Sequence, residues 1–255
     1  MEAVLGGTLY SRMQEDGIFN NHETVFYCAQ IALILDYLHA NKIIFRDLKP
    51  ENLLLAKNGY LKLIDFGLSK VLPEGKTYTM CGTPTHMAPE IYSGKGHNRS
   101  VDWWSFGVVV HELVYGHVLF FALSPHDIYS EITVYSSSYD TFEFPKTTPS
   151  ASCSSFIKRL LNPHPDHRLG MHYDGETNDV FLDDFFKDRI SWIDIMKMHT
   201  KAKYIPKLTD SYDTTNFRSG ANEIIDLGFT EKGSSIDLSN SNLPKECEQD
   251  WFKDF

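Results

Sequence analysis

The chain has 255 residues, 42% of them hydrophobic, so it can bury one sizeable core and is too apolar to be disordered throughout. Its net charge is -10, which argues against nucleic acid as the main partner because phosphate binding needs clustered lysine and arginine. An acidic surface suits basic peptide substrates, although it is also common among proteins that have no such partner.

Helical patterns dominate the chain, with one predicted hairpin between them. Asn20 and Glu23 form a capping-box pattern before a helix whose apolar positions run to Leu38. Apolar runs at 43–45 and 53–55, the turn signal Asn58-Gly59 and a returning run at 61–64 predict a short β-hairpin. Further helices are expected over 101–115, 125–134, 151–161 and 179–186, so the fold class is mainly α within the α+β family. From about 199 the pattern weakens, and 233–244 has the composition of a flexible segment.

No segment predicts a membrane span or a targeting signal. Residues 106–123 are the most apolar stretch, but they include His111, Glu112 and His117, so we expect a buried helix there. The N-terminus lacks the basic and then apolar order of a signal peptide. Four separated cysteines without a Cys-x-x-Cys pair suit a reducing compartment, and we expect a soluble cytoplasmic protein.

Residues 46–52 read Arg-Asp-Leu-Lys-Pro-Glu-Asn, and Asp65-Phe66-Gly67 follows thirteen residues after Asn52. Phosphoryl transfer needs a proton acceptor, oxygen ligands for Mg²⁺ and positive charge near the transferring group. Asp47 is the candidate acceptor and Lys49 the candidate cation, while Asn52 and Asp65 offer the hard oxygen ligands that Mg²⁺ prefers. A lone Asp-x-Lys is usually a solvated turn. Seven matching residues followed by a correctly spaced Asp-Phe-Gly favour a protein kinase catalytic loop instead.

The other half of such a site is not found in this sequence. The 45 residues before Arg46 contain no glycine-rich phosphate loop and no strand lysine that would pair with nucleotide phosphates. We therefore expect the small lobe to be absent, and phosphotransfer by the chain alone to be weak or lost.

The chain resembles the large lobe and tail of an AGC-type serine/threonine protein kinase, and most of all a cGMP-dependent protein kinase. Residues 1–7 are similar to that family's hinge, 81–84 to the end of its activation segment, and 251–255 to its terminal hydrophobic motif. The resemblance implies three parts: a hinge remnant over 1–7, the kinase large lobe over 8–198 and an AGC tail over 199–255. The cAMP-dependent kinases share most of these features.

The resemblance also implies that the cofactors are ATP and Mg²⁺. The residues that would contact adenine are Glu2 and Val4 through their backbones, Leu54 as the pocket floor, and Phe217 from the tail. Thr79 stands where relatives carry an activating phosphate, with Arg46 and Lys70 as its cationic partners. The remaining expected roles are structural or supporting: Thr83 would bond Asp47 and Lys49, Glu90 would pair with Arg168, and Asp102 would hold the catalytic loop.

Substrate recognition is where the sequence departs from the family. Thr8 and Thr85 stand where relatives carry glutamates, so we expect weakened selectivity for basic substrates. Glu51 and Glu112 remain, and the resemblance implies that they hold an arginine two residues before the acceptor. An apolar pocket for the residue after the acceptor would be lined by Met80, Pro84 and Met87.

Two functions of different classes remain open from sequence alone. The first is a serine/threonine kinase whose small lobe, with cyclic-nucleotide-binding domains, lies upstream in a longer protein. The second is a catalytically inactive large lobe that binds substrates, a small lobe or another protein partner as a decoy or scaffold. Retention of Asp47, Lys49, Asn52 and Asp65 favours the first, and the altered Thr8 and Thr85 weakly favour the second.

Overall fold

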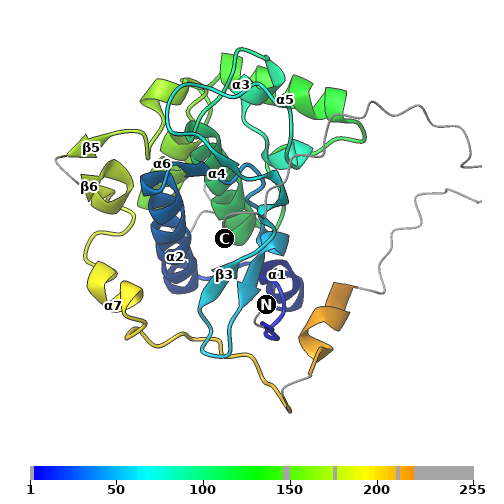
Figure 1. Ribbon diagram of the computed structural model, residues 1–255, viewed down its shortest axis with the longest axis vertical. Coiled ribbons are helices and arrows are strands. Elements are labelled where there is room, and N and C mark those ends of the chain that lie inside the picture. The colour runs from blue at the N-terminus through cyan, green and yellow to red at the C-terminus, as the bar shows by residue number, and fades with distance from the viewer. Residues whose placement is uncertain (1–2, 146–149, 175–176, 211–212, 221–255) are drawn as a thin grey trace, which may run out of the picture. The chain divides into compact units, whose positions relative to one another are not determined.

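Helices are the main regular elements of the structure, a computed structural model that describes residues 3–145, 150–174, 177–210 and 213–220 (Figure 1). Its α-helices are α1 (Leu9–Asp16), α2 (Asn21–Ala40), α3 (Pro89–Tyr92), α4 (Ser100–Tyr115), α5 (Pro125–Ser137), α6 (Ala151–Leu160) and α7 (Trp192–Met196). The described residues belong to one unit spanning Met1–Asn222. The terminal motif 251–255 and the predicted flexible segment 233–244 lie outside the described residues.

Helix α4 is the centre of the core. It packs against α2 and α6, and every residue in it except Tyr115 is buried, including Trp103, Trp104 and Phe106. A helix that is apolar on all sides needs such surroundings, which explains the long apolar run in the sequence. Within the described residues, no helix is both long enough and apolar enough to cross a membrane.

The strands are short, and those in the described part of the chain form three antiparallel pairs. Strand β2 (Leu53–Leu55) pairs with β3 (Leu61–Leu63), with Leu54 opposite Lys62, which confirms the predicted hairpin. Strand β1 (Ile43–Ile44) pairs with β4 (Lys70–Val71), and β5 (Tyr173–Asp174) pairs with β6 (Thr177–Asn178). Gly59 in the hairpin turn has φ 79°, and a Cβ there would lie 2.2 Å from the carbonyl oxygen of Tyr204. Only glycine fits that position.

Short 3₁₀ turns connect these elements: η1 (Pro50–Asn52), η2 (Phe66–Leu68), η3 (Pro84–His86), η4 (Pro165–His167), η5 (Asp179–Leu182) and η6 (Thr215–Gly220). The helix predicted over 179–186 is wrong, because only the turn η5 forms there. The backbone of Asp183 is extended, and its carboxylate accepts the N–H of Phe185. After this turn, the rings of Phe185 and Phe186 pack against Phe156. The apolar residues that suggested a helix therefore belong to a buried loop.

Candidate active site

The catalytic-loop backbone is held by Asp102 of α4, a fully buried residue. Its carboxylate accepts hydrogen bonds from Phe45 N at 2.9 Å, Arg46 N at 2.8 Å and His39 Nε2 at 2.8 Å. Arg46 has φ 72°, a left-handed conformation that a non-glycine residue adopts only when its surroundings support it. Asp102 therefore fixes the turn that presents the next residue, Asp47.

The Asp47 carboxylate is the centre of a polar cluster and is 8% exposed. Its Oδ1 accepts hydrogen bonds from Thr83 N at 2.9 Å and Thr83 Oγ1 at 2.6 Å, and its Oδ2 accepts one from Asn52 Nδ2 at 3.1 Å. Lys49 Nζ lies 3.3 Å from Oδ2 and donates to Thr83 Oγ1 at 2.9 Å. The structure thus brings together three of the residues grouped from the catalytic-loop motif, Asp47, Lys49 and Asn52, with Thr83, which the family resemblance implied as their partner. The fourth of that group, Asp65, makes no hydrogen bond or ion pair with this cluster among the described residues.

These neighbours keep Asp47 ionised. Burial alone would raise the pKa of Asp47, but the Thr83 hydrogen bond, the Lys49 ammonium and the Asn52 hydrogen bond outweigh burial and lower that pKa below its ordinary value of 3.8. A carboxylate in this state can accept a proton from a hydroxyl group at neutral pH.

This lowered pKa predicts a pH dependence of stability. A depressed folded-state pKa adds stability above the unfolded-state pKa, and that contribution is lost as the pH falls through the folded-state value. The unfolding free energy of the wild type, measured by urea titration relative to Asp47→Asn, should be level near neutral pH and decline below about pH 5. A difference that grows on acidification would contradict the lowered pKa.

Asn52 and Asp65 suit a Mg²⁺ site by the chemistry of their donors. Asn52 Nδ2 donates to Asp47 O at 2.8 Å, which leaves the amide oxygen of Asn52 as the atom that could bind a cation. Asp65 is exposed and has φ 60°, and its Oδ1 accepts the N–H of Gly67 at 3.2 Å. An amide oxygen and a carboxylate are ligands of the kind Mg²⁺ takes together with substrate phosphates and water.

The segment predicted to hold adenine lies beside β2. Leu55 N donates to Gly7 O at 2.9 Å, Gly6 N donates to Leu55 O at 3.1 Å, and Leu54 forms a bridge with Thr8. From the tail, Asn216 Nδ2 donates to Leu5 O at 3.1 Å.

Asn216 therefore contacts residues 5–7, and its close approach requires a glycine at position 7. Gly7 has φ 81°, and a Cβ there would lie 2.4 Å from Asn216 O. Val4 is partly buried and Phe217, next to Asn216, is 38% exposed. Glu2 lies outside the described residues. The adenine-binding roles of Val4, Leu54 and Phe217 remain predictions.

Arg46 and Lys70 contact groups other than Thr79 in this structure. Lys70 Nζ donates to Thr77 Oγ1 at 2.9 Å, and Arg46 Nε donates to Leu68 O at 2.6 Å. Arg46 Nη1 is buried without a hydrogen-bond partner among the described residues, and Thr79 is exposed. The role of Thr79 as a phosphosite remains a prediction.

The predicted substrate contacts differ in exposure. Glu51 is exposed and Met80 is 61% exposed, whereas Pro84 is partly buried and Met87 is buried. Glu112 is also buried, and its Oε1 lies 2.7 Å from His86 Nε2. A substrate arginine at Glu112 would have to share that carboxylate with His86. Sequence reasoning missed His86, because nothing in the spacing of these two residues indicates contact.

Glu90 and Arg168 form a buried ion pair behind the site. Arg168 Nη1 lies 2.6 Å from Glu90 Oε1, and Arg168 Nη2 lies 3.0 Å from Glu90 Oε2. Burial alone would raise the pKa of Glu90, but the charge and hydrogen bonds of Arg168 outweigh burial and lower it. This pair ties helix α3, at the end of the activation segment, to the loop after α6.

The sequence matches the protein kinase domain family over residues 1–177. It is 37% identical over 219 residues to the cAMP-dependent protein kinase catalytic subunit PRKX of Homo sapiens, covering 86% of this chain and 59% of that protein. It is 37% identical over 218 residues to the cGMP-dependent protein kinase egl-4 of Caenorhabditis elegans, covering 85% of this chain and 27% of that protein. A cGMP-dependent protein kinase of Drosophila melanogaster, isozyme 2 forms cD5/T2, is 39% identical over 218 residues, which is 85% of this chain and 23% of that protein. The chain thus spans less than two thirds of the length of each.

Proposed function

This chain belongs to the protein kinase domain family, within its AGC group, and we propose that it carries the acceptor-side catalytic machinery of a serine/threonine protein kinase. The proposal rests on the Asp47 cluster. In it, Thr83, Lys49 and Asn52 contact an ionised carboxylate within residues 46–52. ATP-dependent phosphoryl transfer to a protein hydroxyl needs such a group.

The proposed step uses Asp47 as general base. A substrate serine or threonine gives its proton to the Asp47 carboxylate while its oxygen bonds to the γ-phosphorus of ATP, and ADP leaves. Mg²⁺ held by Asn52 and Asp65 would neutralise phosphate charge. Lys49, which already lies beside Asp47 and Thr83, adds positive charge near the acceptor oxygen.

We propose that Thr83 favours Ser and Thr acceptors because it fixes Asp47 and Lys49 in one arrangement. Peptides with an arginine two residues before the acceptor are the proposed substrates. Glu51 is exposed and free to meet such an arginine, while the contact between Glu112 and His86 supports a selectivity weaker than that expected for two free carboxylates.

Phosphotransfer by the 255 residues alone is proposed to be weak. The glycine-rich loop and strand lysine that position nucleotide phosphates are not among these residues, and positioning can lower a barrier by about 7 to 11 kcal/mol. The proposed arrangement is a large lobe over 8–198 with an AGC tail from 199, working with a small lobe.

A Mg·ATP assay of the chain alone tests this arrangement. With a serine peptide carrying an arginine two residues earlier, we expect phosphorylation at or just above background, with any signal lost in Asp47→Ala. Rapid phosphorylation that Asp47→Ala removes would contradict the proposed weakness. Phosphorylation that Asp47→Ala leaves unchanged would contradict the role of Asp47 as base.

A further inference from the structure

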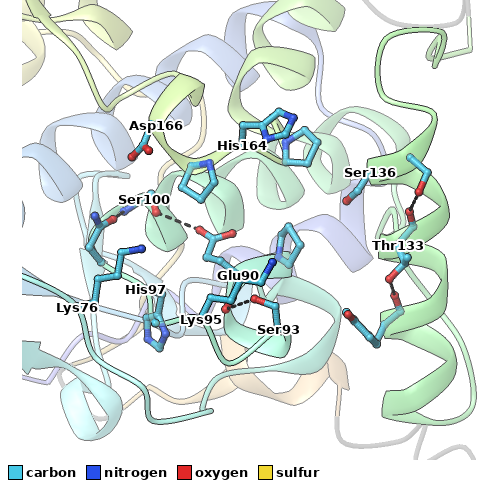
Figure 2. A pocket seen from close by; sticks show the side chains of 17 residues that line it. Lys76, Glu90, Ser93, Lys95, His97, Ser100, Thr133, Ser136, His164 and Asp166 are labelled. Atoms are coloured by element: carbon cyan, nitrogen blue, oxygen red, sulfur yellow. Dashed lines mark hydrogen bonds between the residues drawn. The ribbon is translucent and has the colours of Figure 1, made fainter.

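A cavity of about 480 Å³, drawn in Figure 2, has a lining that combines apolar surface with lysine, hydroxyl and carboxylate groups. It is bounded by the activation-segment residue Lys76, the loop that carries Lys95 and His97, helix α5, and residues 163–166. The residues assigned to catalysis, Mg²⁺ and adenine do not line it. Its volume falls within the range of about 300 to 1,000 Å³ typical of small-molecule sites.

Two exposed lysines, Lys76 and Lys95, line this cavity. No ion pair or hydrogen bond joins Lys76 or Lys95 to a residue that the structure describes, although both line the cavity. The Glu90 carboxylate on the wall is already neutralised by Arg168, which leaves Asp166 as the opposing charge. A ligand that contacts both ammonium groups would be favoured by carrying more than one negative charge.

Helix α5 forms a wall of hydroxyl groups, on which Figure 2 shows Thr133 and Ser136. Each hydroxyl hydrogen is committed to the helix backbone: Thr133 donates to Tyr129 O at 2.9 Å, Ser136 to Ile132 O at 2.7 Å, and Ser137 to Thr133 O at 2.9 Å. The oxygens are left as acceptors only. A ligand that meets them must therefore donate hydrogen bonds.

His97 lines the cavity and connects it to the activation segment. It is 3% exposed, and its Nε2 has no hydrogen-bond partner among the described residues. Its backbone pairs with Thr77 through two hydrogen bonds of 2.9 Å, and Thr77 in turn accepts from Lys70. Burial lowers the pKa of His97, so its ring is neutral at physiological pH and adds no charge.

We propose that this cavity binds a small hydroxylated phosphate ester, with its phosphate at Lys76 and Lys95 and its hydroxyl groups against α5. A phosphate monoester carries nearly two negative charges at neutral pH, which matches the two ammonium groups. Its hydroxyl groups can donate hydrogen bonds to the oxygens of Thr133, Ser136 and Ser137. Binding would hold Lys76 against the loop at His97 and so brace the activation segment beside Thr77.

Isothermal titration calorimetry of the full chain tests the site with three probes. Glucose 6-phosphate carries both features, inorganic phosphate lacks the sugar hydroxyls, and glucose lacks the charge. We expect glucose 6-phosphate to bind at least tenfold more tightly than either of the others. Equal binding of inorganic phosphate, or no binding of glucose 6-phosphate, would overturn the proposal.

Variants locate the binding within the cavity. The double variant Lys76→Gln with Lys95→Gln should weaken the binding of glucose 6-phosphate by roughly tenfold or more, because each substitution removes a charge-assisted hydrogen bond. Thr133→Val with Ser136→Ala should reduce the preference over inorganic phosphate. Lys57→Gln with Lys187→Gln is the matched control, because these exposed lysines do not line the cavity.

Two further measurements keep the result interpretable. Thermal unfolding without ligand should be unchanged in the lysine variants, which separates lost binding from lost folding. Hydrogen exchange at 76–79 should slow when glucose 6-phosphate is added to the wild type. Undiminished binding in the double lysine variant, or binding confined to vesicles that display phosphoinositide headgroups, would overturn the proposal.

Discussion

Glu90→Ala is expected to destabilise the protein by about 3 to 5 kcal/mol, because it leaves the fully buried Arg168 without its carboxylate. Arg168 keeps hydrogen bonds to Ser100 O at 2.9 Å and Asn162 O at 2.9 Å, but neither neutral carbonyl replaces a charge. Such a loss is a large part of the stability of a typical domain. Urea unfolding followed by circular dichroism measures it.

Glu74→Ala is a matched control, since Glu74 is exposed and its removal should change the unfolding free energy by less than about 0.5 kcal/mol. The double variant Glu90→Gln with Arg168→Met removes both charges. Its unfolding free energy should therefore fall by less than that of Glu90→Ala alone. A loss below about 1 kcal/mol for Glu90→Ala would show that water or another group already screens Arg168.

Asp102→Ala is expected to have the second large effect. It should lower the unfolding free energy and loosen the backbone of the catalytic loop. The change leaves three buried donors without an acceptor: Phe45 N, Arg46 N and His39 Nε2. Each unsatisfied donor costs about 1 to 3 kcal/mol, so we expect a total loss of at least about 3 kcal/mol. Urea unfolding gives this value.

Hydrogen exchange of the Phe45 and Arg46 amides separates the loop effect from global stability. Both amides should exchange faster in Asp102→Ala, under conditions where the α4 amides are still protected. Asp184→Ala serves as the control because Asp184 is exposed. Unchanged protection at Phe45 and Arg46 would mean that the loop holds its left-handed turn without Asp102.

Local signals explain why the hairpin and the grouping of Asp47, Lys49 and Asn52 could be predicted. Asn58-Gly59 specifies the turn, and the cluster draws mainly on residues 47–52, so short-range spacing carries most of the information. Helices α2 and α4 were also predicted, since their apolar runs are long. The Asn20 side chain caps α2 by accepting from His22 N and Glu23 N.

Tertiary contacts explain what could not be predicted. Helix α1 has few apolar residues, and Arg12 within it is buried under the ring of Tyr204, 4.0 Å from the ring centroid. The His86–Glu112 contact and the His39–Asp102 bond join segments far apart in sequence. No periodicity in the chain indicates such pairs, whose partners are set by how α4 packs against its neighbours.

A fusion that supplies a kinase small lobe ahead of residue 5 tests the central claim most directly. With Mg·ATP and the same arginine-containing serine peptide, the fusion should phosphorylate the peptide, and Asp47→Asn should lower kcat/KM by about 10² to 10⁴ without weakening ATP binding. Asp184→Asn in the same fusion should leave kcat/KM unchanged, because Asp184 is exposed and lies outside both proposed sites. A fusion that binds ATP but transfers no phosphate, or transfers it equally well with Asp47→Asn, would contradict the assignment and favour a binding role for this chain.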